Sequence, residues 1–417
     1  MSPHLFIEKD SLHILGNRFH IKSLPTIYVV GAGKAAAAMA EATENIVGDL
    51  IAGGLIVTKY GHSLALKKIR CIEAAHPLPD ENSLAGAEET IQLLKEAGEG
   101  DIVICLISGG ASSLWADLPA GSSLGELQDV FGLLLKSGAD IKEMNAVRKH
   151  LSTVKGGQLL RYAPRANWFT LIISDVPDDE LDTIASGPTV ADASTFADVK
   201  TILNKYALTD QLPTSILQHI NDGVAGSIAE TPKENEPIFK QVQHKIIGNN
   251  SVALAAAAAK ARELGYHIHF IEKDLNGDAA KVGREFIESC KKYEGIKPAC
   301  VLLGGETTVT VKGNGKGGRN QHMALSALCE MLDENEVDNA NRITFLSAGT
   351  DGTDGPTDAA GAIADKDVLT NAIKQQLNPT SYLEDNDAYH FFEQVGGLLK
   401  TGATQTNVMD LVVVIVE

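Results

Sequence analysis

One stretch of the chain, residues 302–321, combines residue types that together can bind an anion. It reads LLGGETTVTVKGNGKGGRNQ, so four glycines within six residues lie between Lys312 and Arg319. Glycine lets backbone N–H groups approach a ligand closely, and lysine and arginine add cationic donors. Fixed N–H groups and cations are what a phosphate needs. The alternative is a glycine-rich hairpin with solvated lysines, because short Gly/Lys patterns often occur by chance.

A second candidate for anion binding is the segment GAGKAA, in which Lys34 follows Gly33 at the start of an expected helix. This segment partly fits the dinucleotide-binding pattern, but Lys59 stands where that pattern needs an acid. It is not a Walker A loop either, because alanine follows Lys34. The helix dipole disfavours a cation at this end, and an anionic ligand would offset that cost. We therefore interpret Lys34 as facing a phosphate or carboxylate, against the alternative of an incidental surface lysine.

Polar residues also follow three other apolar runs. Asp351 and Asp175 come shortly after expected strands, and carboxylates suit Mg²⁺ binding or general-base work. Turn formation is the alternative for both aspartates. The segment SGGASS, which begins at Ser108, lacks the GxSxG pattern of a nucleophile, so we favour a backbone cradle for an anion.

The expected elements place these residues at strand ends. In the first half, apolar runs predict strands at residues 26–30, 54–58, 71–75, 101–107 and 168–173, with helices at 35–44, 83–97, 123–137 and 141–151. In the second half, strands are expected at 244–247, 267–271, 300–303, 307–311, 343–347 and 411–416, with helices at 251–264, 278–291 and 321–332. Alternation of strand, glycine turn and helix is typical of a doubly wound α/β sheet, whose ligands bind at the carboxyl ends of the strands.

Composition limits the class of protein. The 417 residues are enough for two domains, and a charged connector with Pro232 and Pro237 places the boundary near residue 240. A net charge of −18 argues against nucleic acid and anionic membranes as partners. Five cysteines without a CxxC pair, and no signal-like or membrane-length segment, favour the cytoplasm.

Many segments, taken in order, resemble the glycerate 2-kinase family of the MOFRL type, some of whose members carry the label hydroxypyruvate reductase. The matching segments are VVGAGKAA, HPLPDENS, LISGGASSL, NAVRKHLSTVKGG, LIISDVP, IASGPT, GNN, LLGGETTVTVKGNGKGGRNQ, SAGTDGTDGPTDAAGA and TNVMDL. The resemblance implies an α/β protein with a Rossmann-like doubly wound N-terminal domain, residues 1–240. It also implies an α/β MOFRL-type C-terminal domain with a mixed sheet, residues 241–417.

The resemblance further implies a kinase that transfers the γ-phosphoryl of ATP to the 2-hydroxyl of D-glycerate, with Mg²⁺, in a cleft between the domains. Lys34 and Arg319 match residues regarded as active in the family, and we add Asp351 as metal ligand or general base and Asp175 as a further metal ligand. Substrate contacts are expected from Lys34, Arg148, Arg319 and Asn320. Nucleotide contacts are expected from Gly33, Ser108, Gly109, Gly110, Ala111, Lys155, Gly304, Glu306, Gly315, Gly317 and Gly318.

Some positions depart from the family pattern, and they put the substrate preference and the loop shapes in doubt. Asp178 stands for a glycine, His322 for an acid, and Ala403 and Gln405 change a C-terminal segment. Two other functions stay open: an NAD(P)-dependent hydroxypyruvate reductase, and a non-catalytic protein that binds a sugar acid or a nucleotide. The motifs do not separate a 2-phospho from a 3-phospho product, and a homodimer stays open.

Overall fold

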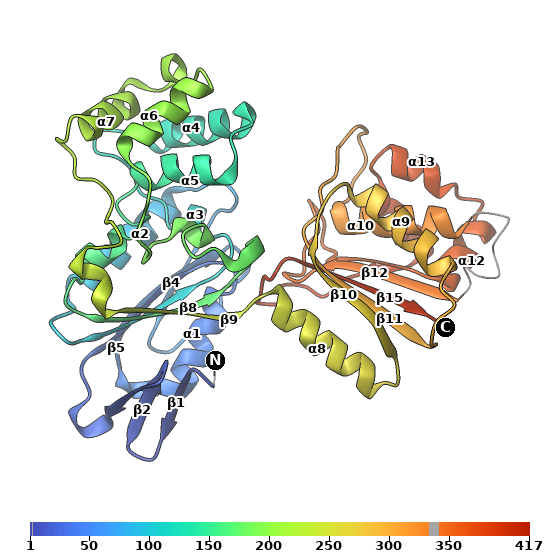
Figure 1. Ribbon diagram of the computed structural model, residues 1–417, viewed down its shortest axis with the longest axis horizontal. Coiled ribbons are helices and arrows are strands. Elements are labelled where there is room, and N and C mark those ends of the chain that lie inside the picture. Colours follow the sequence, from blue (N-terminus) through green and yellow to red (C-terminus); the bar gives the residue numbers. More distant parts are fainter. Residues whose placement is uncertain (2, 333–341) are drawn as a thin grey trace. The chain divides into compact units, whose positions relative to one another are not determined.

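The computed structural model describes residues 1, 3–332 and 342–417. The chain divides into two compact units, Met1–Ile247 and Gly248–Glu417 (Figure 1). Both units build helices around a β-sheet, as expected from the sequence.

The sheet of the first unit is a doubly wound sheet. Its strands lie in the order β6-β5-β4-β7-β8-β9, and the pairs from β6 to β8 are parallel. In chain order this is the 3-2-1-4-5-6 arrangement of Rossmann-type sheets, so the predicted fold class is confirmed. The strands are β4 (Ile27–Ala32), β5 (Ile51–Lys59), β6 (Arg70–Ala74), β7 (Ile102–Ile107), β8 (Asn167–Ile173) and β9 (Val242–Gly248). The sequence predicts β9 as part of the second domain, but this strand forms the edge of the first sheet.

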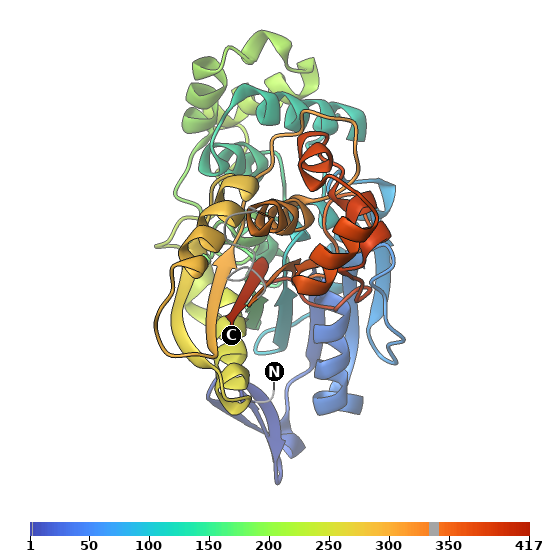
Figure 2. The same cartoon turned by 90° about the vertical axis from the view of Figure 1, so that its right-hand side faces the viewer.

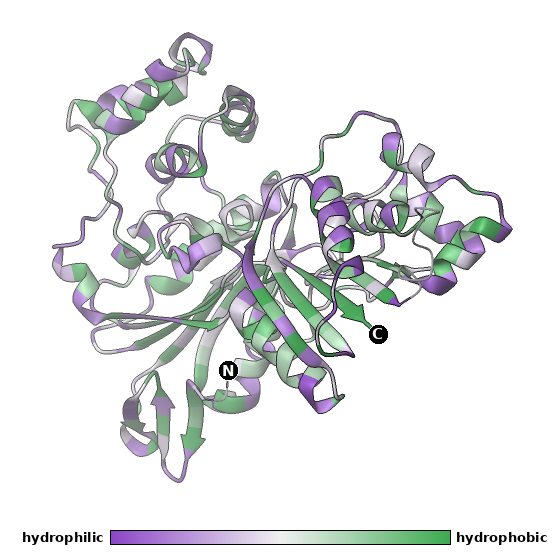
Figure 3. Ribbon diagram, turned by 45° about the vertical axis from the view of Figure 1, so that its right-hand side comes forward, coloured by the Kyte–Doolittle hydropathy of each residue, from purple (hydrophilic) through white to green (hydrophobic). Residues whose placement is uncertain are grey.

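Both faces of this sheet are covered, which explains why its central strands are continuous apolar runs. Successive residues of β4 and β7 point to opposite faces and belong to two separate core clusters. One face packs against α1 (Ala36–Val47) and the N-terminal hairpins, β1 (Leu5–Glu8), β2 (Ser11–Ile14) and β3 (Asn17–His20). The other packs against α2 (Glu81–Leu94) and α3 (Ala111–Leu114). The strands are accordingly rich in hydrophobic residues (Figure 3).

A group of helices at one end of the first unit has a core of its own (Figure 2). It consists of α4 (Leu124–Ser137), α5 (Ile141–His150), α6 (Phe196–Lys205) and α7 (Thr214–Val224). Ser123 and Asp140 begin α4 and α5 with reciprocal capping boxes, each accepting a hydrogen bond from the backbone three residues ahead. These caps fix where the two helices begin, and α5 carries Asn145 and Arg148.

The second unit contains the predicted mixed sheet, in the order β10-β11-β15-β12-β13-β14. Strand β15 runs antiparallel to both neighbours, whereas β10 and β11 are parallel. The strands are β10 (His267–Leu275), β11 (Ala299–Gly305), β12 (Ile343–Gly349), β13 (Gly361–Ala364), β14 (Leu398–Leu399) and β15 (Asp410–Val416). The strand predicted at residues 307–311 is wrong: this segment makes only an isolated bridge between Thr308 and Asp278.

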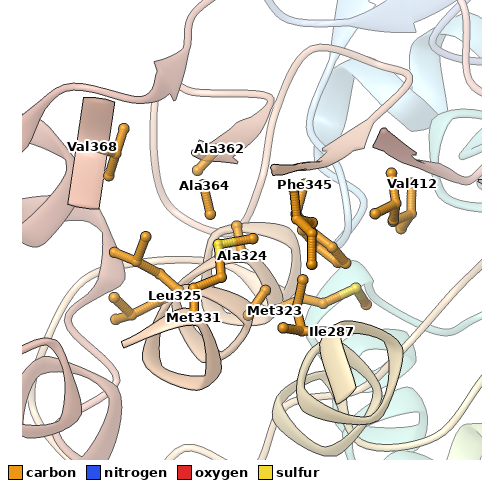
Figure 4. Packing of buried hydrophobic residues seen from close by; sticks show 14 of the residues in the cluster. Ile287, Met323, Ala324, Leu325, Met331, Phe345, Ala362, Ala364, Val368 and Val412 are labelled. Atoms are coloured by element: carbon orange, nitrogen blue, oxygen red, sulfur yellow. The ribbon is translucent and has the colours of Figure 1, made fainter. Parts of the chain in front are cut away.

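Helices cover both faces of the second sheet. Helix α8 (Asn250–Glu263) packs on one face of β11, against Cys300 and Leu302. Helices α9 (Ala279–Lys291) and α10 (Arg319–Met331) pack on the other, where Met323 and Ala324 contact the core built around Phe345 and Val412 (Figure 4). The other helices among the described residues of this unit are α12 (Lys366–Lys374), α13 (Pro379–Glu384) and α14 (Ala388–Val395).

Candidate functional site

Two glycine turns meet at the point in the first sheet where the strand order reverses. Strand β4 ends before Gly33 and Lys34, and its neighbour β7 ends before Ser108. The backbone N–H of Lys34 donates to Gly109 O at 2.9 Å, so the two turns are held together. Ligands of doubly wound sheets bind at this kind of edge. The structure therefore brings together the first-unit residues that the sequence predicted around Lys34.

Ser108 helps to build this edge. Its buried hydroxyl oxygen accepts a hydrogen bond from Ala35 N at 2.9 Å, at the start of α1. The helix has no side-chain cap of its own, so Ser108 satisfies one of its free N–H groups from a neighbouring turn. Gly33 must lie against Ser108 for this, because a Cβ at Gly33 would be 2.1 Å from Ser108 Oγ.

Gly110 lies beside two side chains that can face a ligand. Its φ is +85°, and a Cβ there would approach His76 Cδ2 to 2.9 Å and Lys34 Cγ to 3.6 Å. A side chain at position 110 would fill the space next to Lys34. The glycine therefore keeps backbone, imidazole and lysine close together at the start of α3.

Two further cations of the first unit, Arg148 and Lys155, are desolvated. Burial lowers the pKa of Arg148, whose guanidinium lies 5.2 Å from the centre of the Phe131 ring. Burial also lowers the pKa of Lys155 to about 8; Asp117 opposes this shift and Arg148 adds to it. Lys155 Nζ donates to Trp115 O at 2.6 Å, at the end of α3. Both cations are predicted site residues. Arg148 lies on α5, and Lys155 contacts the end of α3.

The candidate metal ligands are placed in separate units. Asp175 follows β8 in the first unit and Asp351 follows β12 in the second. Asp351 is buried, and its Oδ1 accepts bonds from Thr353 N and Oγ1, both at 3.0 Å. This is the turn-forming contact that the sequence left open as an alternative. Within residues 1, 3–332 and 342–417, no group of three or more His, Cys, Asp or Glu side chains could hold a metal ion.

In the second unit, Arg319 is held by two carboxylates. Its Nε and Nη2 donate to both oxygens of buried Asp410, at 2.5 and 3.0 Å, and its Nη1 lies 2.6 Å from Glu306 Oε1. Burial opposes the charge, but these ion pairs outweigh it and raise the pKa of Arg319. A guanidinium has five N–H groups, so two remain for a ligand as far as the described residues go. Glu306, predicted to contact the nucleotide, instead pairs with Arg319 in this structure.

Asp354 caps the helix that Arg319 begins. Its carboxylate accepts from the backbone N–H groups of Asn320 and Gln321, at 3.1 and 2.8 Å. Helix α10 has no cap from Gly318, so a residue from the loop after β12 satisfies its first turn. Burial, with a smaller contribution from Asp410, raises the pKa of Asp354 to about 6 despite these bonds.

The raised pKa of Asp354 predicts a pH dependence of stability. The folded protein holds the proton below about pH 6, whereas the unfolded chain holds it only below about 3.8. The contribution of Asp354 to stability should therefore rise as the pH falls from about 6 to about 4, by up to ~3 kcal/mol. Urea unfolding of the wild type and Asp354→Asn across this range would measure it. A stability difference between the two proteins that is constant with pH would contradict the prediction.

The glycine-rich loop packs on its own unit. Backbone N–H groups from Lys312 to Lys316 donate to one short segment, whose acceptors are Asn386 Oδ1, Asp385 Oδ1, Asp385 O and Asp387 Oδ1. A Cβ at Gly315 would be 2.3 Å from Asp387 Cβ, so the glycines allow this close approach. The predicted phosphate cradle is therefore not formed by the N–H groups of residues 312–316 in this structure. Gly317 and Gly318 stay candidates for backbone contact with a phosphate.

Two other second-unit residues have structural contacts. Asn320 is buried, donates to Asp354 Oδ1 at 3.2 Å and accepts from Ser347 Oγ at 2.6 Å, so both ends of its amide are engaged. Gly304 makes room for Asn250, because a Cβ there would be 1.8 Å from Asn250 Oδ1. These contacts explain the two residue types without a ligand.

Two departures from the family pattern keep the backbone shape of glycine. Asp178 and Gln405 stand where the family pattern has glycine, and their φ angles are +60° and +61°. This left-handed conformation is free for glycine and uncommon for other residues. Both residues therefore hold a backbone conformation that glycine adopts more readily. His322 lies buried in α10, and burial lowers its pKa.

Of the residues that hold Arg319 and α10, sequence reasoning singled out Glu306, as a nucleotide contact, but not Asp410 or Asp354. Asp410 belongs to the matched segment TNVMDL, and this was the only signal for it. Asp354 belongs to the matched segment SAGTDGTDGPTDAAGA, but its capping role depends on a contact 34 residues away. None of the described helices is long and apolar enough to cross a bilayer.

Comparisons with known proteins agree over nearly the whole chain. Residues 2–221 match a domain of unknown function, DUF4147, and residues 299–410 match the MOFRL family. The chain is 42% identical to glycerate 2-kinase of Pyrococcus horikoshii, covering 98% of this chain and 91% of the relative. It is 41% identical to D-glycerate 2-kinase of Thermotoga maritima, covering 94% and 91%.

Solved structures give the same result. The crystal structure of glycerate kinase from Thermotoga maritima is similar with a TM-score of 0.83 and 40% identity, covering 95% of this chain and 92% of that one. Among the relatives compared by sequence alone, human glycerate kinase is 33% identical, covering 92% of this chain and 83% of the relative. This chain belongs to the glycerate kinase family of enzymes, with both its DUF4147 and its MOFRL regions.

Proposed function

We propose that this protein transfers the γ-phosphoryl of ATP to the 2-hydroxyl of D-glycerate, giving 2-phospho-D-glycerate and ADP. The observation that carries the proposal is the match of more than 90% of the chain to two enzymes named glycerate 2-kinase. Phosphoryl transfer needs mainly positioning and charge neutralisation. Cationic groups held in fixed places, within an acidic chain, fit that need.

In the first unit, we assign Lys34 to an anionic group of the substrates. The turns at Gly33 and at Ser108–Ala111 fix its backbone, and Gly110 leaves space beside its side chain. Arg148 and Lys155 add positive charge from desolvated positions, where each charge acts more strongly than in water.

In the second unit, we assign Arg319 to the transferring phosphoryl group. Asp410 and Glu306 hold its guanidinium through three N–H groups, and among the described residues two N–H groups remain for phosphoryl oxygens. Mg²⁺ commonly needs only one or two carboxylates beside phosphate oxygens, so a three-carboxylate cluster is not required. Asp351 and Asp175 are carboxylates of the right kind for that ion, which would neutralise phosphate charge when bound. The alternative assignment for Asp351 is general base for the substrate hydroxyl.

A coupled assay for ADP release with D-glycerate, followed by phosphorus NMR of the product, tests the proposal. We expect ATP-dependent turnover and a 2-phospho product. A 3-phospho product would overturn the assigned position. NADH oxidation with hydroxypyruvate, without ADP release from glycerate, would favour the reductase instead. Lys59 ends β5 where a nicotinamide enzyme of this fold would carry an acid, which speaks against that outcome.

The pKa of Lys155 predicts how activity changes with pH. If its charge helps to bind an anionic substrate, kcat/KM should fall as the pH rises through about 8, where Lys155 loses its proton. Lys155→Arg should keep the charge and move this decline to a much higher pH, since arginine stays protonated. Steady-state kinetics from pH 6.5 to 9.5 would show it. The same decline in the arginine variant would exclude Lys155 as its source.

A further inference from the structure

Asn145 takes part in a short chain of hydrogen bonds that the function proposed above does not use. It lies on α5, and Ser186 Oγ donates to its Oδ1 at 3.1 Å. Ser186 Oγ is also 3.1 Å from Ser112 Oγ. A hydroxyl group has one hydrogen, so Ser186 donates to Asn145 and accepts from Ser112. With its amide oxygen facing Ser186, Asn145 has its NH₂ group left for another partner.

That NH₂ group has no partner in the described part of the chain. Asn145 is only 4% exposed, and its Nδ2 is buried without a hydrogen-bond acceptor. Buried amide donors are nearly always satisfied in folded proteins, and leaving one unpaired is costly. The structure therefore holds a donor in place for an acceptor that the chain itself does not supply.

The groups around this donor indicate the kind of acceptor. Ser112 lies two residues after Gly110, which is packed beside Lys34 and His76. Arg148 lies three residues after Asn145, on the same side of α5, and is half-buried with no ion pair among the described residues. Asn145 and Arg148 thus present a buried donor and a cation from the same side of α5, and an anionic oxygen is the acceptor that suits a donor beside a cation.

Ser186 is held in place by an uncommon backbone. Ala185 and Ser186 have φ angles of +56° and +57°, which non-glycine residues rarely adopt. This conformation places the Ser186 hydroxyl between Ser112 of α3 and Asn145 of α5. The orientation of the Asn145 amide is therefore set by the fold before a ligand binds.

We propose that Asn145 Nδ2 donates a hydrogen bond to an anionic oxygen of a bound substrate, a carboxylate or a phosphate, and so positions that substrate in the first unit. The identity of the substrates, D-glycerate and a nucleotide, rests on the function proposed above. Asn145 is a binding residue in this role, and the pairing with Ser186 orients it.

Asn145→Asp tests the role, because it keeps the acceptor for Ser186 and replaces the NH₂ group by an oxygen. Asn221→Asp on α7 is the matched control, since there too the amide oxygen has the partner, Lys200 Nζ at 3.1 Å. Dissociation constants of D-glycerate and of ADP are measured separately by calorimetry on the full chain. Melting temperatures without ligand are recorded for each protein.

We expect Asn145→Asp to raise the dissociation constant of one probe at least tenfold and to change the other less than twofold. A loss confined to D-glycerate assigns the acceptor to its carboxylate, and a loss confined to ADP assigns it to a phosphate. Unchanged binding of both, or an equal loss of both, would overturn the proposal. Asn221→Asp should bind both probes as the wild type does.

A second variant decides the matter if Asn145→Asp fails to fold. Ser186→Ala keeps the amide donor but removes the bond that orients it, so the same selective loss is expected at a smaller size, about threefold to tenfold. No change in either dissociation constant would then overturn the proposal. The ADP-release assay on the wild type is run in parallel: binding of D-glycerate without turnover would refute the kinase function and leave the binding role of Asn145 intact.

Discussion

Replacing Arg319 by alanine should lower kcat/KM for D-glycerate about 10³-fold or more, the range found for arginines that stabilise phosphoryl transfer. The variant loses the two N–H groups that remain after Arg319 has bonded to Asp410 and Glu306. Steady-state kinetics would measure the effect. Arg284→Ala, which removes an exposed arginine from α9 of the same unit, is the control and should keep wild-type rates.

Loss of Arg319 also leaves Asp410 buried without its cation, which should cost about 3–5 kcal/mol of stability. The double variant Arg319→Ala, Asp410→Asn removes that buried charge. It should recover much of the melting temperature while its activity stays low. Activity within a few-fold of the wild type in either variant would show that Arg319 has no part in the reaction.

Replacing Gly33 by alanine should destabilise the first unit by about 3 kcal/mol, since it combines overpacking with an unfavourable backbone angle. The added Cβ would lie 2.1 Å from Ser108 Oγ and 2.5 Å from Ser108 O, so one of the two turns must move. Activity should fall as well, because Lys34 is the next residue and would move with the turn. Gly61→Ala is the control for the angle alone: its φ is +77°, and a Cβ there would meet nothing within 4 Å. Thermal melts of equal midpoint for the two variants would contradict this reasoning.

The parts of the fold that the sequence predicted are those with a local cause. Strands β4, β7 and β8 are buried on both faces, so each is a continuous apolar run. The strand expected at residues 307–311 has the right alternation but lacks a neighbouring strand along its length. Alternation alone cannot form a ladder, because every strand needs a partner. The hairpins β1 to β3 were missed, since each strand has only four residues of mixed polarity.

The site residues also divide into those that a local pattern reveals and those that depend on distant partners. The glycine turns after β4 and β7 are local features, and the structure brings them together because those strands are neighbours. The partners of the predicted residues are distant: Asp410 lies 91 residues from Arg319 in the sequence. The contacts of the loop at residues 312–316 were not foreseen for the same reason, since the acceptors of its N–H groups lie about seventy residues away and no local pattern marks them.

The position of β15 has a consequence for how the chain matures during translation. This strand follows every other strand of its sheet in the sequence, yet it lies between β11 and β12 and begins with Asp410. Until the ribosome has released it, β11 and β12 present unpaired edges, and Arg319 lacks the carboxylate that orients it. We therefore expect the second unit to expose these strand edges during synthesis, and catalytic competence to arise only after β15 has emerged.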